Sequence, residues 1–445
     1  MSTKNKYGLS TCIAMIIGIV IGSGIFFKSD NILIATNGNI LLGALAFCIA
    51  AISIIFGSLT VAELAARNDK PGGIISYAEE SYNGGIACAL GWFQTFLYYP
   101  TLIAVVCYVV GVYGEILFGI EGSLESKIFI GLITCIIVFC MNAFASKLAG
   151  LFQTSATVIK LIPLALIGIA GFVFGSPVES IQAASTASPQ NSNLSWLSAL
   201  VPIVFAFDGW ITATAISHEV KDAKKNVPLA LICAPLFILA IYLLYFIGIS
   251  TYLGPEVIMA AGDSHVDIAA NQLFGPLGAK AILVFVLISV LGTANGLTMG
   301  LCRSPYSLAL RNMFPCSDKI SKVNEKFDFP IASTLVGFVI VLFWLAVHYL
   351  TQKFNLLPNS DVSEISITLN YIAFVLLYVQ VLRLGIKREI KSIWKGIVTP
   401  ILAILGSIII LVVGLQNPLF IYYALICGLL FVSAYMFWKY HSAKA

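Results

Sequence analysis

Residues 16–26 read IIGIVIGSGIF, an apolar run that the flexible triplet Gly22-Ser23-Gly24 interrupts. Glycine lets a chain leave the helical conformation and lets a ligand approach the backbone closely. A break here would free N–H groups at the start of the following half-helix, where the helix dipole favours an anion such as a carboxylate. The alternative is structural, because Gly18 and Gly22 could form a small-residue face for helix packing.

A second apolar run, residues 203–216, is interrupted by Asp208-Gly209. Carbonyls freed by a break here could accept the three N–H bonds of an ammonium group, and Phe205 and Trp210 are large enough to close over a ligand. The alternative is an ordinary aromatic cluster in a helix core. Interrupted helices at corresponding places in two halves of a chain predict an inverted-repeat transporter whose site lies at the bilayer centre.

The composition agrees with a membrane protein. Of 445 residues, 59% are hydrophobic and 10% are charged, whereas a soluble domain has about 45–50% apolar and about 25% charged residues. Unbroken apolar runs such as 128–140, 229–250 and 400–415 indicate membrane helices rather than the alternating strands of a barrel. The predicted fold class is therefore an all-α polytopic membrane protein.

We predict one transmembrane domain of twelve helices arranged as a five-plus-five inverted repeat. Repeat one covers about residues 10–175, repeat two about 196–384, and two additional helices about 394–438. The predicted spans are about 10–35, 40–66, 85–114, 127–144, 148–175, 196–219, 228–252, 278–311, 331–350, 364–384, 394–415 and 417–438.

Positive charge is distributed very unevenly between the two sides of this topology. Of the 25 Lys and Arg residues, Lys28, Lys127, Lys280 and Lys353 fall on one side and Lys160 falls within a span. All the others fall on the side of the N-terminus. Because cytoplasmic loops are enriched in Lys and Arg, we expect both termini to be cytoplasmic.

Lys160 and Asp208 are the two charges that this topology places inside the membrane, where an unpaired charge is costly. Lys160 could be a proton site or a fixed replacement for a bound cation, or its stem could extend to an interface. Asp208 could pair with a cationic substrate, or it could cap the broken helix, which we favour.

The eighth span carries Asn295, Arg303 and Tyr306 toward its end. We interpret these residues as a possible inner gate, with Arg303 alternatively an anchor at the cytoplasmic end. Glu219, followed by a basic loop, is a further gate or topology residue.

Several function classes are excluded by the sequence. It contains no GxxxxGK[ST] run for ATP, its four histidines are isolated and lack metal-ligand spacing, and an aspartyl protease would need a second membrane aspartate. We expect no catalytic residue, no cofactor, no metal and no nucleic-acid partner. The ten cysteines are scattered without a CxxC pair, so we expect reduced thiols.

These motifs resemble those of the amino acid–polyamine–organocation (APC) superfamily, in particular bacterial relatives of its L-amino acid transporter branch. The resemblance covers nearly the whole chain. In the matching segment 219–228, Ala223 occupies a position at which members of this family more often have proline. The matching segments are Gly22-Ser23-Gly24-Ile25-Phe26, residues 205–210, residues 219–228, Pro71-Gly72-Gly73 and Arg303-Ser304-Pro305-Tyr306.

The resemblance implies a leucine-transporter-type fold and a role for each part of the two breaks. Backbone N–H groups would bind the substrate carboxylate, carbonyls would bind its amine, and Phe205 would be a gating aromatic. Lys160 would occupy the place of a sodium ion. The implied donors are at Ser23, Gly24 and Ile25, the implied acceptors are near Val20, Phe205 and Asp208, and Gly22, Ala206, Phe207, Gly209 and Trp210 complete the candidate substrate site.

The resemblance also bears on partners. Some family members join a glycoprotein subunit through a cysteine between helices three and four, but residues 115–127 contain none. We therefore expect no disulfide-linked subunit, a monomer or weak oligomer, and an amino acid and membrane lipid as the partners.

The hypothesis is a sodium-independent secondary transporter of L-amino acids in the plasma membrane of a bacterium. It would work by alternating access, through exchange or proton coupling, with neutral amino acids favoured. An arginine- or diamine-type antiporter is an alternative, and a substrate-sensing receptor without net transport is a rival from another class.

Overall fold

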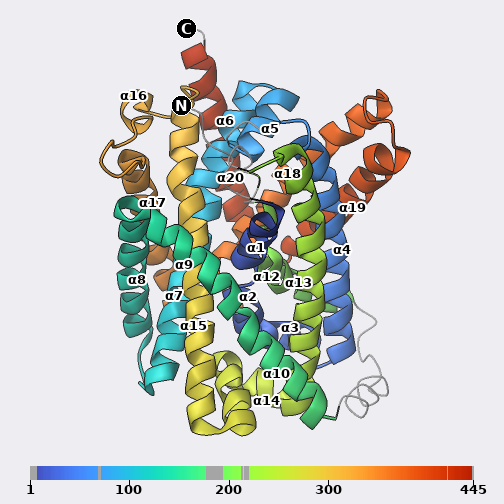
Figure 1. Ribbon diagram of the computed structural model, residues 1–445, viewed down its shortest axis with the longest axis vertical. Helices are drawn as coiled ribbons and strands as arrows, with labels where there is room; N and C mark the ends of the chain where they lie inside the picture. Colours follow the sequence, from blue (N-terminus) through green and yellow to red (C-terminus); the bar gives the residue numbers. More distant parts are fainter. Residues whose placement is uncertain are drawn as a thin grey trace.

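The computed structural model describes residues 8–68, 72–176, 194–211, 214, 220–417 and 419–442. Within these ranges the regular elements are helical, and Asn324 and Phe329 form an isolated bridge. The predicted all-α class is confirmed. Figure 1 shows the helices as a bundle whose long elements run along one axis, as expected where backbone groups must be bonded internally within lipid.

The elements of the first half follow the predicted order. They are α1 (Leu9–Val20), α2 (Ser23–Phe27), α3 (Ser29–Ala35), α4 (Ile40–Ala65), α5 (Ile74–Ser81), α6 (Gly84–Phe93), the π-helical turn η1 (Gln94–Tyr98), α7 (Tyr99–Phe118), α8 (Leu124–Phe144), α9 (Ser146–Ile159) and α10 (Leu161–Phe174).

The second half begins with a 3₁₀ turn and contains the longest helices. Its elements are η2 (Leu194–Ala199), α12 (Leu200–Phe207), α13 (Ala223–Leu253), α14 (Pro255–Ala261), η4 (Gly262–Ser264), α15 (His265–Ala309), α16 (Ser317–Ile320), α17 (Ile331–Lys353), α18 (Val362–Ile386), η5 (Trp394–Val398), α19 (Thr399–Gly414) and α20 (Phe420–Ser442).

Among the described residues, eleven helices are long and apolar enough to cross a membrane. The predicted sixth span corresponds to a shorter apolar helix, Ser195–Phe207, and most of the residues that follow Ile211 in that span lie outside the described part. The count of twelve therefore stays a prediction. The eighth span is longer than predicted because α15 already begins at His265, although Gly275, with φ +69°, interrupts it just before the predicted start.

Both predicted breaks are present. Helix α1 ends at Val20, Ile21 is extended (φ −72°, ψ 102°), and α2 begins at Ser23. Helix α12 ends at Phe207, where Asp208 is extended and Gly209 has φ +94°. A residue with a side chain rarely adopts that conformation, which explains the glycine at position 209.

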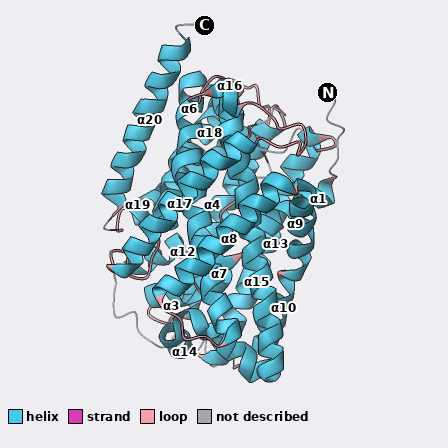
Figure 2. Ribbon diagram, turned by 90° about the vertical axis from the view of Figure 1, so that its left-hand side faces the viewer, coloured by secondary structure: helices cyan, strands magenta, loops and turns pink. Residues whose placement is uncertain are grey.

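The topology prediction assigns most Lys and Arg residues to one end of the bundle. Figure 1 places α16 and the end of α20 at one end, and α14 and the loop between α7 and α8 at the other. Lys319 of α16 and Lys439 of α20 are at the basic end predicted to be cytoplasmic. In Figure 2, α20 lies at the edge of the bundle. Which end is cytoplasmic remains a prediction.

Helices α10 and α13 pack against each other through glycines. A Cβ on Gly171 would overlap the carbonyl group of Gly248, and one on Gly248 would overlap the carbonyl oxygen of Gly168. Small residues let two backbones approach this closely in a membrane, where van der Waals packing between helices stabilises the bundle.

We predict that Gly171→Leu destabilises the protein, because the new side chain has no space unless α10 and α13 separate. Overpacking of this kind costs about 1–3 kcal/mol or more. The measurement is the thermal unfolding midpoint in detergent. Gly428→Leu is the matched control, since a Cβ there meets nothing within 4 Å. An unchanged midpoint for Gly171→Leu would contradict the packing argument.

Candidate functional site

The two helix breaks lie against each other in the middle of the bundle. A Cβ on Gly24 would be 2.5 Å from the Cα of Ala206, and a Cβ on Gly209 would be 2.7 Å from the Cγ2 of Ile19. The missing side chain of one glycine in each broken helix therefore leaves the space that the other broken helix occupies. The structure brings together two motifs that are about 180 positions apart in the sequence.

A small cavity lies between the breaks and two further helices, α7 and α15. Its volume is about 20 Å³, which is room for about one water molecule. Its lining includes Val20, Gly22, Gly24, Phe205 and Asp208, as predicted. The residues that the sequence analysis did not single out are Ile19, Leu102, Val106, Thr293 and Leu297.

Five further predicted site residues are buried and do not line the cavity, namely Ile25, Ala206, Phe207, Gly209 and Trp210. The Phe207 ring packs against that of Tyr242, with centroids 5.0 Å apart, and the Trp210 ring packs against that of Phe374 at 5.3 Å. Ile25 and Ala206 are buried, and Ser23 is the first residue of α2. Phe207 and Trp210 thus pack in aromatic pairs, as the alternative of an aromatic cluster expects.

Tyr242 of α13 stands between the two breaks. Its hydroxyl oxygen lies 3.1 Å from the Val20 carbonyl oxygen and 2.8 Å from the Ala206 carbonyl oxygen. The Phe205 carbonyl accepts the N–H of Asp208 at 3.2 Å. The Tyr242 hydroxyl thus shares its one hydrogen between the Val20 and Ala206 carbonyls, and Tyr242 is a site residue that no local sequence pattern marks.

Asp208 is also bonded within the protein. It accepts a hydrogen bond from the Tyr98 hydroxyl, with 2.5 Å between the two oxygens, and it interacts with the backbone of Gly209. Tyr98 ends the π-helical turn η1, and such turns are frequent at functional sites. These contacts agree with the capping interpretation of Asp208.

Lys160, between α9 and α10, is fully buried, so the alternative in which it extends to an interface is wrong. Its ammonium group donates to the Gly18 carbonyl at 2.5 Å, and Gln153 donates to the same carbonyl at 3.2 Å. A Cβ on Gly292 of α15 would lie 3.5 Å from the ammonium nitrogen. The Lys160 side chain therefore connects α1 to the fifth span and faces the eighth.

Asn295 belongs to the same polar network, although we predicted it as a gate residue. Its amide nitrogen donates to the Gln153 side chain and to the Ala149 carbonyl, both at 3.0 Å. Its amide oxygen accepts a hydrogen bond from Asn142 at 2.9 Å. Asn295 thus ties α15 to α8 and α9 inside the bundle.

Arg303 and Tyr306 lie away from the cavity lining. The Arg303 guanidinium donates to the Met299 carbonyl at 3.1 Å and lies 5.8 Å from the centroid of the Phe329 ring. The backbone N–H of Tyr306 donates to the Ser333 hydroxyl at 3.0 Å. These contacts hold the end of α15 against the start of α17. Glu219 lies outside the described residues.

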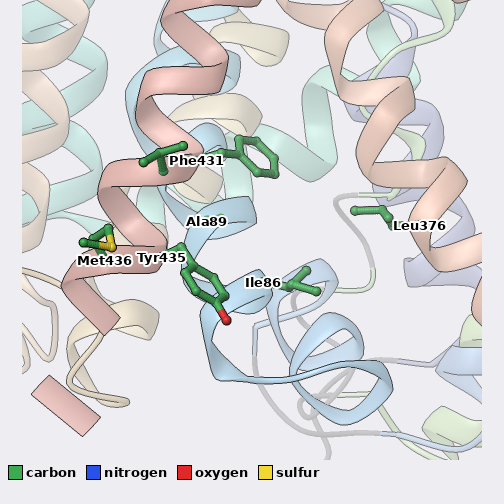
Figure 3. Close-up of a pocket in the computed structure, with 7 residues that line it drawn as sticks. Ile86, Ala89, Leu376, Phe431, Tyr435 and Met436 are labelled. Carbon is green, nitrogen blue, oxygen red and sulfur yellow. The ribbon is translucent and has the colours of Figure 1, made fainter. Parts of the chain in front are cut away.

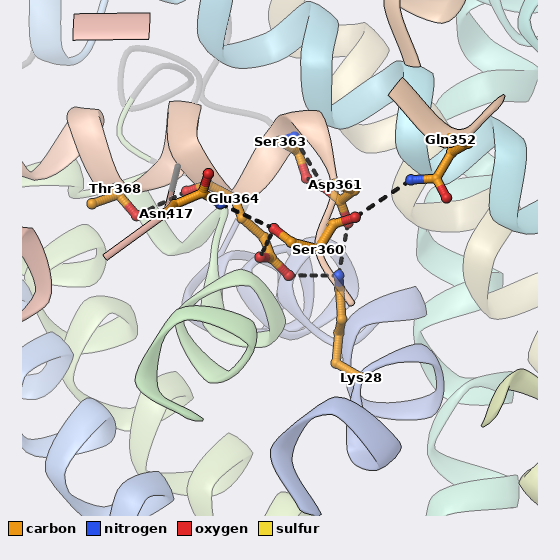
Figure 4. A network of polar contacts seen from close by, with 8 residues as sticks. All are labelled: Lys28, Gln352, Ser360, Asp361, Ser363, Glu364, Thr368 and Asn417. Atoms are coloured by element: carbon orange, nitrogen blue, oxygen red, sulfur yellow. Dashed lines mark hydrogen bonds and ion pairs between the residues drawn. The ribbon is translucent and has the colours of Figure 1, made fainter. Parts of the chain in front are cut away.

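Lys28 is a buried cation that we had counted among the charges outside the membrane core. It is 1% exposed, and its ammonium nitrogen lies 2.7 Å from Asp361 and 2.6 Å from Glu364 (Figure 4). The same nitrogen lies 5.2 Å from the centroid of the Phe205 ring. Two features of the sequence could have indicated this buried cluster. One is a lysine within the predicted first span, and the other is a pair of carboxylates three positions apart at the start of the predicted tenth span.

A larger cavity of about 340 Å³ lies apart from the breaks, between α6, α18 and α20 (Figure 3). It is apolar and contains none of the predicted site residues. Its lining residues are Ile86, Ala89, Leu376, Phe431, Val432, Tyr435 and Met436.

The comparison with known proteins covers nearly the whole chain. The family described as amino acid permease matches residues 7–432. The serine/threonine exchanger SteT of Bacillus subtilis (strain 168) is 32% identical over 416 residues, which are 92% of this chain and 90% of that protein.

Two animal transporters match more distantly, each over about two thirds of its own length or less. The b(0,+)-type amino acid transporter 1 of Mus musculus is 26% identical over 302 residues, 66% of this chain and 61% of that protein. The cystine/glutamate transporter of Homo sapiens is 24% identical over 338 residues, 75% of this chain and 66% of that protein. Broken helices around a central cavity and these matches lead to one conclusion: the chain belongs to the amino acid permease family of the APC superfamily and is a membrane transporter of amino acids, not an enzyme.

Proposed function

We propose that this permease exchanges small neutral L-amino acids across the cell membrane, without sodium, by alternating access around the two broken helices. The observation that carries the proposal is the contact of the two breaks at one cavity, with a buried lysine bound to the first broken helix. Both termini would be cytoplasmic. The substrate class is supported by the cavity and by the name of the serine/threonine exchanger that matches over 92% of the chain.

The backbone around the first break supplies the donors for a carboxylate. Helix α2 begins at Ser23 after Gly22, and no side chain caps its first turn. The first N–H groups of a helix have no partner within it, and the helix dipole adds to their attraction for an anion. The N–H groups of Ser23, Gly24 and Ile25 are therefore the proposed carboxylate site.

The proposed amine site uses the carbonyls on the other side of the cavity. An ammonium group donates three hydrogen bonds, and the Val20 and Asp208 backbones end their half-helices at the cavity. Since the cavity admits about one water molecule, a bound amino acid requires Phe205 or its neighbours to move. This requirement favours substrates with short side chains.

Lys160 supports the proposal of sodium independence. Its side-chain nitrogen already occupies the position at the Gly18 carbonyl, and in its charged form it repels a second cation at the same place. The proposal assigns the lysine the structural role that a bound cation would otherwise have.

The contacts of Asp208 bear on the alternative of a cationic substrate. Its carboxylate is engaged by Tyr98, so an arginine or diamine would have to compete with an internal hydrogen bond. A receptor without transport remains the rival from another class, and the first experiment below distinguishes the two.

We predict that proteoliposomes loaded with unlabelled serine take up labelled serine or threonine, and that replacing sodium with potassium leaves the rate unchanged. Exchange follows from binding at a site that alternates between the two sides. Liposomes without protein are the control. Binding of serine with neither uptake nor exchange would support the receptor, an absolute need for sodium would contradict the role of Lys160, and inhibition only by arginine or diamines would favour the cationic alternative.

We predict that Gly24→Ala lowers the exchange rate and that Gly24→Val abolishes exchange. Any Cβ at this position collides with the backbone of Ala206 and separates the two breaks. Exchange rate and serine binding are the measurements. Gly114→Ala is the matched control, a buried glycine in α7 where a Cβ meets nothing within 4 Å. Normal serine affinity in Gly24→Val would remove this glycine from the site.

We predict that Lys160→Ala lowers the exchange rate by about tenfold or more, since a buried hydrogen bond to a charged group contributes about 1.5–3 kcal/mol. Lys280→Ala, at an exposed position of α15, is the control and should keep the wild-type rate. Rates are compared at equal amounts of folded protein. A wild-type rate in Lys160→Ala would contradict the assignment, and a sodium-stimulated rate in that variant would strengthen it.

A further inference from the structure

The cluster formed by Lys28, Asp361 and Glu364 contains one amine and two carboxyl groups. The ammonium of Lys28 lies 2.7 Å from an Asp361 oxygen and 2.6 Å from a Glu364 oxygen, and the three side chains are 1%, 4% and 3% exposed. Figure 4 shows the ammonium between the two carboxyl groups. If both carboxyls were ionised, the cluster would carry a net negative charge in a site closed to water.

A buried charge without a partner costs several kcal/mol, so such groups are paired or neutralised. The titratable side chains facing the cluster from other elements provide no second permanent cation within the described residues. They are Tyr108 of α7, Asp263 of η4, His348 of α17 and Tyr423 of the last helix. A proton is the simplest way to balance the charge.

The two carboxyl groups of the cluster differ in the hydrogen bonds that they receive. Besides Lys28, Asp361 accepts the backbone N–H of Ser363 at 2.8 Å and the hydroxyl of the same serine. Three donors favour an ionised carboxylate. Apart from Lys28, the one hydrogen-bond partner of the Glu364 carboxyl group among the described residues is the Ser360 hydroxyl, with 2.5 Å between the oxygens. A hydroxyl can also accept a hydrogen bond, so Ser360 can receive one from a protonated Glu364.

His348 is the other group that could hold the proton. It is 1% exposed, packs against the Tyr108 ring at 4.8 Å, and neither ring nitrogen has a hydrogen-bond partner. An imidazolium would bury two unpaired N–H donors beside the ammonium of Lys28. The geometry therefore favours a neutral His348 and a proton on Glu364.

We propose that the Lys28–Asp361–Glu364 cluster is a proton-binding site, in which Glu364 takes up one proton when the cluster forms while Asp361 stays paired with Lys28. The proton comes from the solvent as the cluster forms, and it converts the Glu364 carboxylate to the carboxylic acid.

Proton binding by the cluster also has a consequence for transport. This consequence rests on the proposed function, whereas the proton binding itself does not. Lys28 connects α2 and α3 of the first broken helix, and both carboxyls belong to the start of α18. The Lys28 ammonium also contacts Phe205, which lines the cavity. Closing the cavity on this side thus forms the cluster and takes up a proton. By linkage, low pH stabilises this closed form, and high pH favours its opening because the ionised Glu364 regains water.

The direct test is infrared difference spectroscopy of the purified protein during a pH titration. A protonated carboxylic acid has a C=O stretch that an ionised carboxylate lacks. We expect wild type to show a carboxylic acid band that is lost in Glu364→Gln and retained in Asp361→Asn. Ser360→Ala should shift the frequency of the band, which keeps the test valid if Glu364→Gln does not fold.

Each other outcome overturns the proposal. A band that persists unchanged in Glu364→Gln places the proton elsewhere. The absence of any titrating band that depends on Glu364 or Ser360 would show that the cluster does not bind a proton. A pH response that only His348→Asn eliminates assigns the proton to the imidazole instead.

Exchange by proteoliposomes separates this proposal from the proposed function. We expect the pH dependence of serine exchange to flatten in Glu364→Gln while exchange continues. If wild type shows the infrared band but no exchange at any pH, the proposed function fails and the proton site remains. If exchange occurs with the same pH profile in wild type and Glu364→Gln, the coupling to closure is wrong.

Discussion

Lipid offers no hydrogen bonds, so a helix that breaks within a membrane must find partners for its freed backbone groups inside the protein. Here two helices break, at Ile21 and at Asp208, and much of the surrounding structure meets this requirement. The Gly18 carbonyl is bonded by Lys160 and the Ala206 carbonyl by Tyr242. The buried lysine and tyrosine thus supply hydrogen-bond donors to carbonyls that the two helix breaks leave without a partner in their own helix.

The sequence predicts the fold well because each decisive signal is local. Long apolar runs mark the helices, and Gly22 and Asp208-Gly209 mark the breaks. The prediction is weakest at the sixth span, where the described helix ends at Phe207. A break shortens the apolar segment on which a span count depends, so the property that identifies the site also obscures the number of helices.

The site is only partly predictable because its remaining members come from unbroken helices. Leu102 and Thr293 line the cavity from α7 and α15, but one sequence does not show which side of an apolar helix faces inward. Lys28 was misplaced for a related reason. A lysine near a span end looks like a surface charge until its partners, more than 300 positions away, are known.

Tyr242 lies within hydrogen-bond distance of two carbonyls, yet a phenol has a single hydrogen to donate. That hydrogen can therefore bond the Val20 or the Ala206 carbonyl, but it does not serve both fully. The ammonium of an amino acid has three hydrogens, so a bound substrate can donate to the carbonyl that Tyr242 leaves. In the exchange that we propose, the substrate thus supplies the hydrogen-bond donors that the single hydrogen of Tyr242 does not.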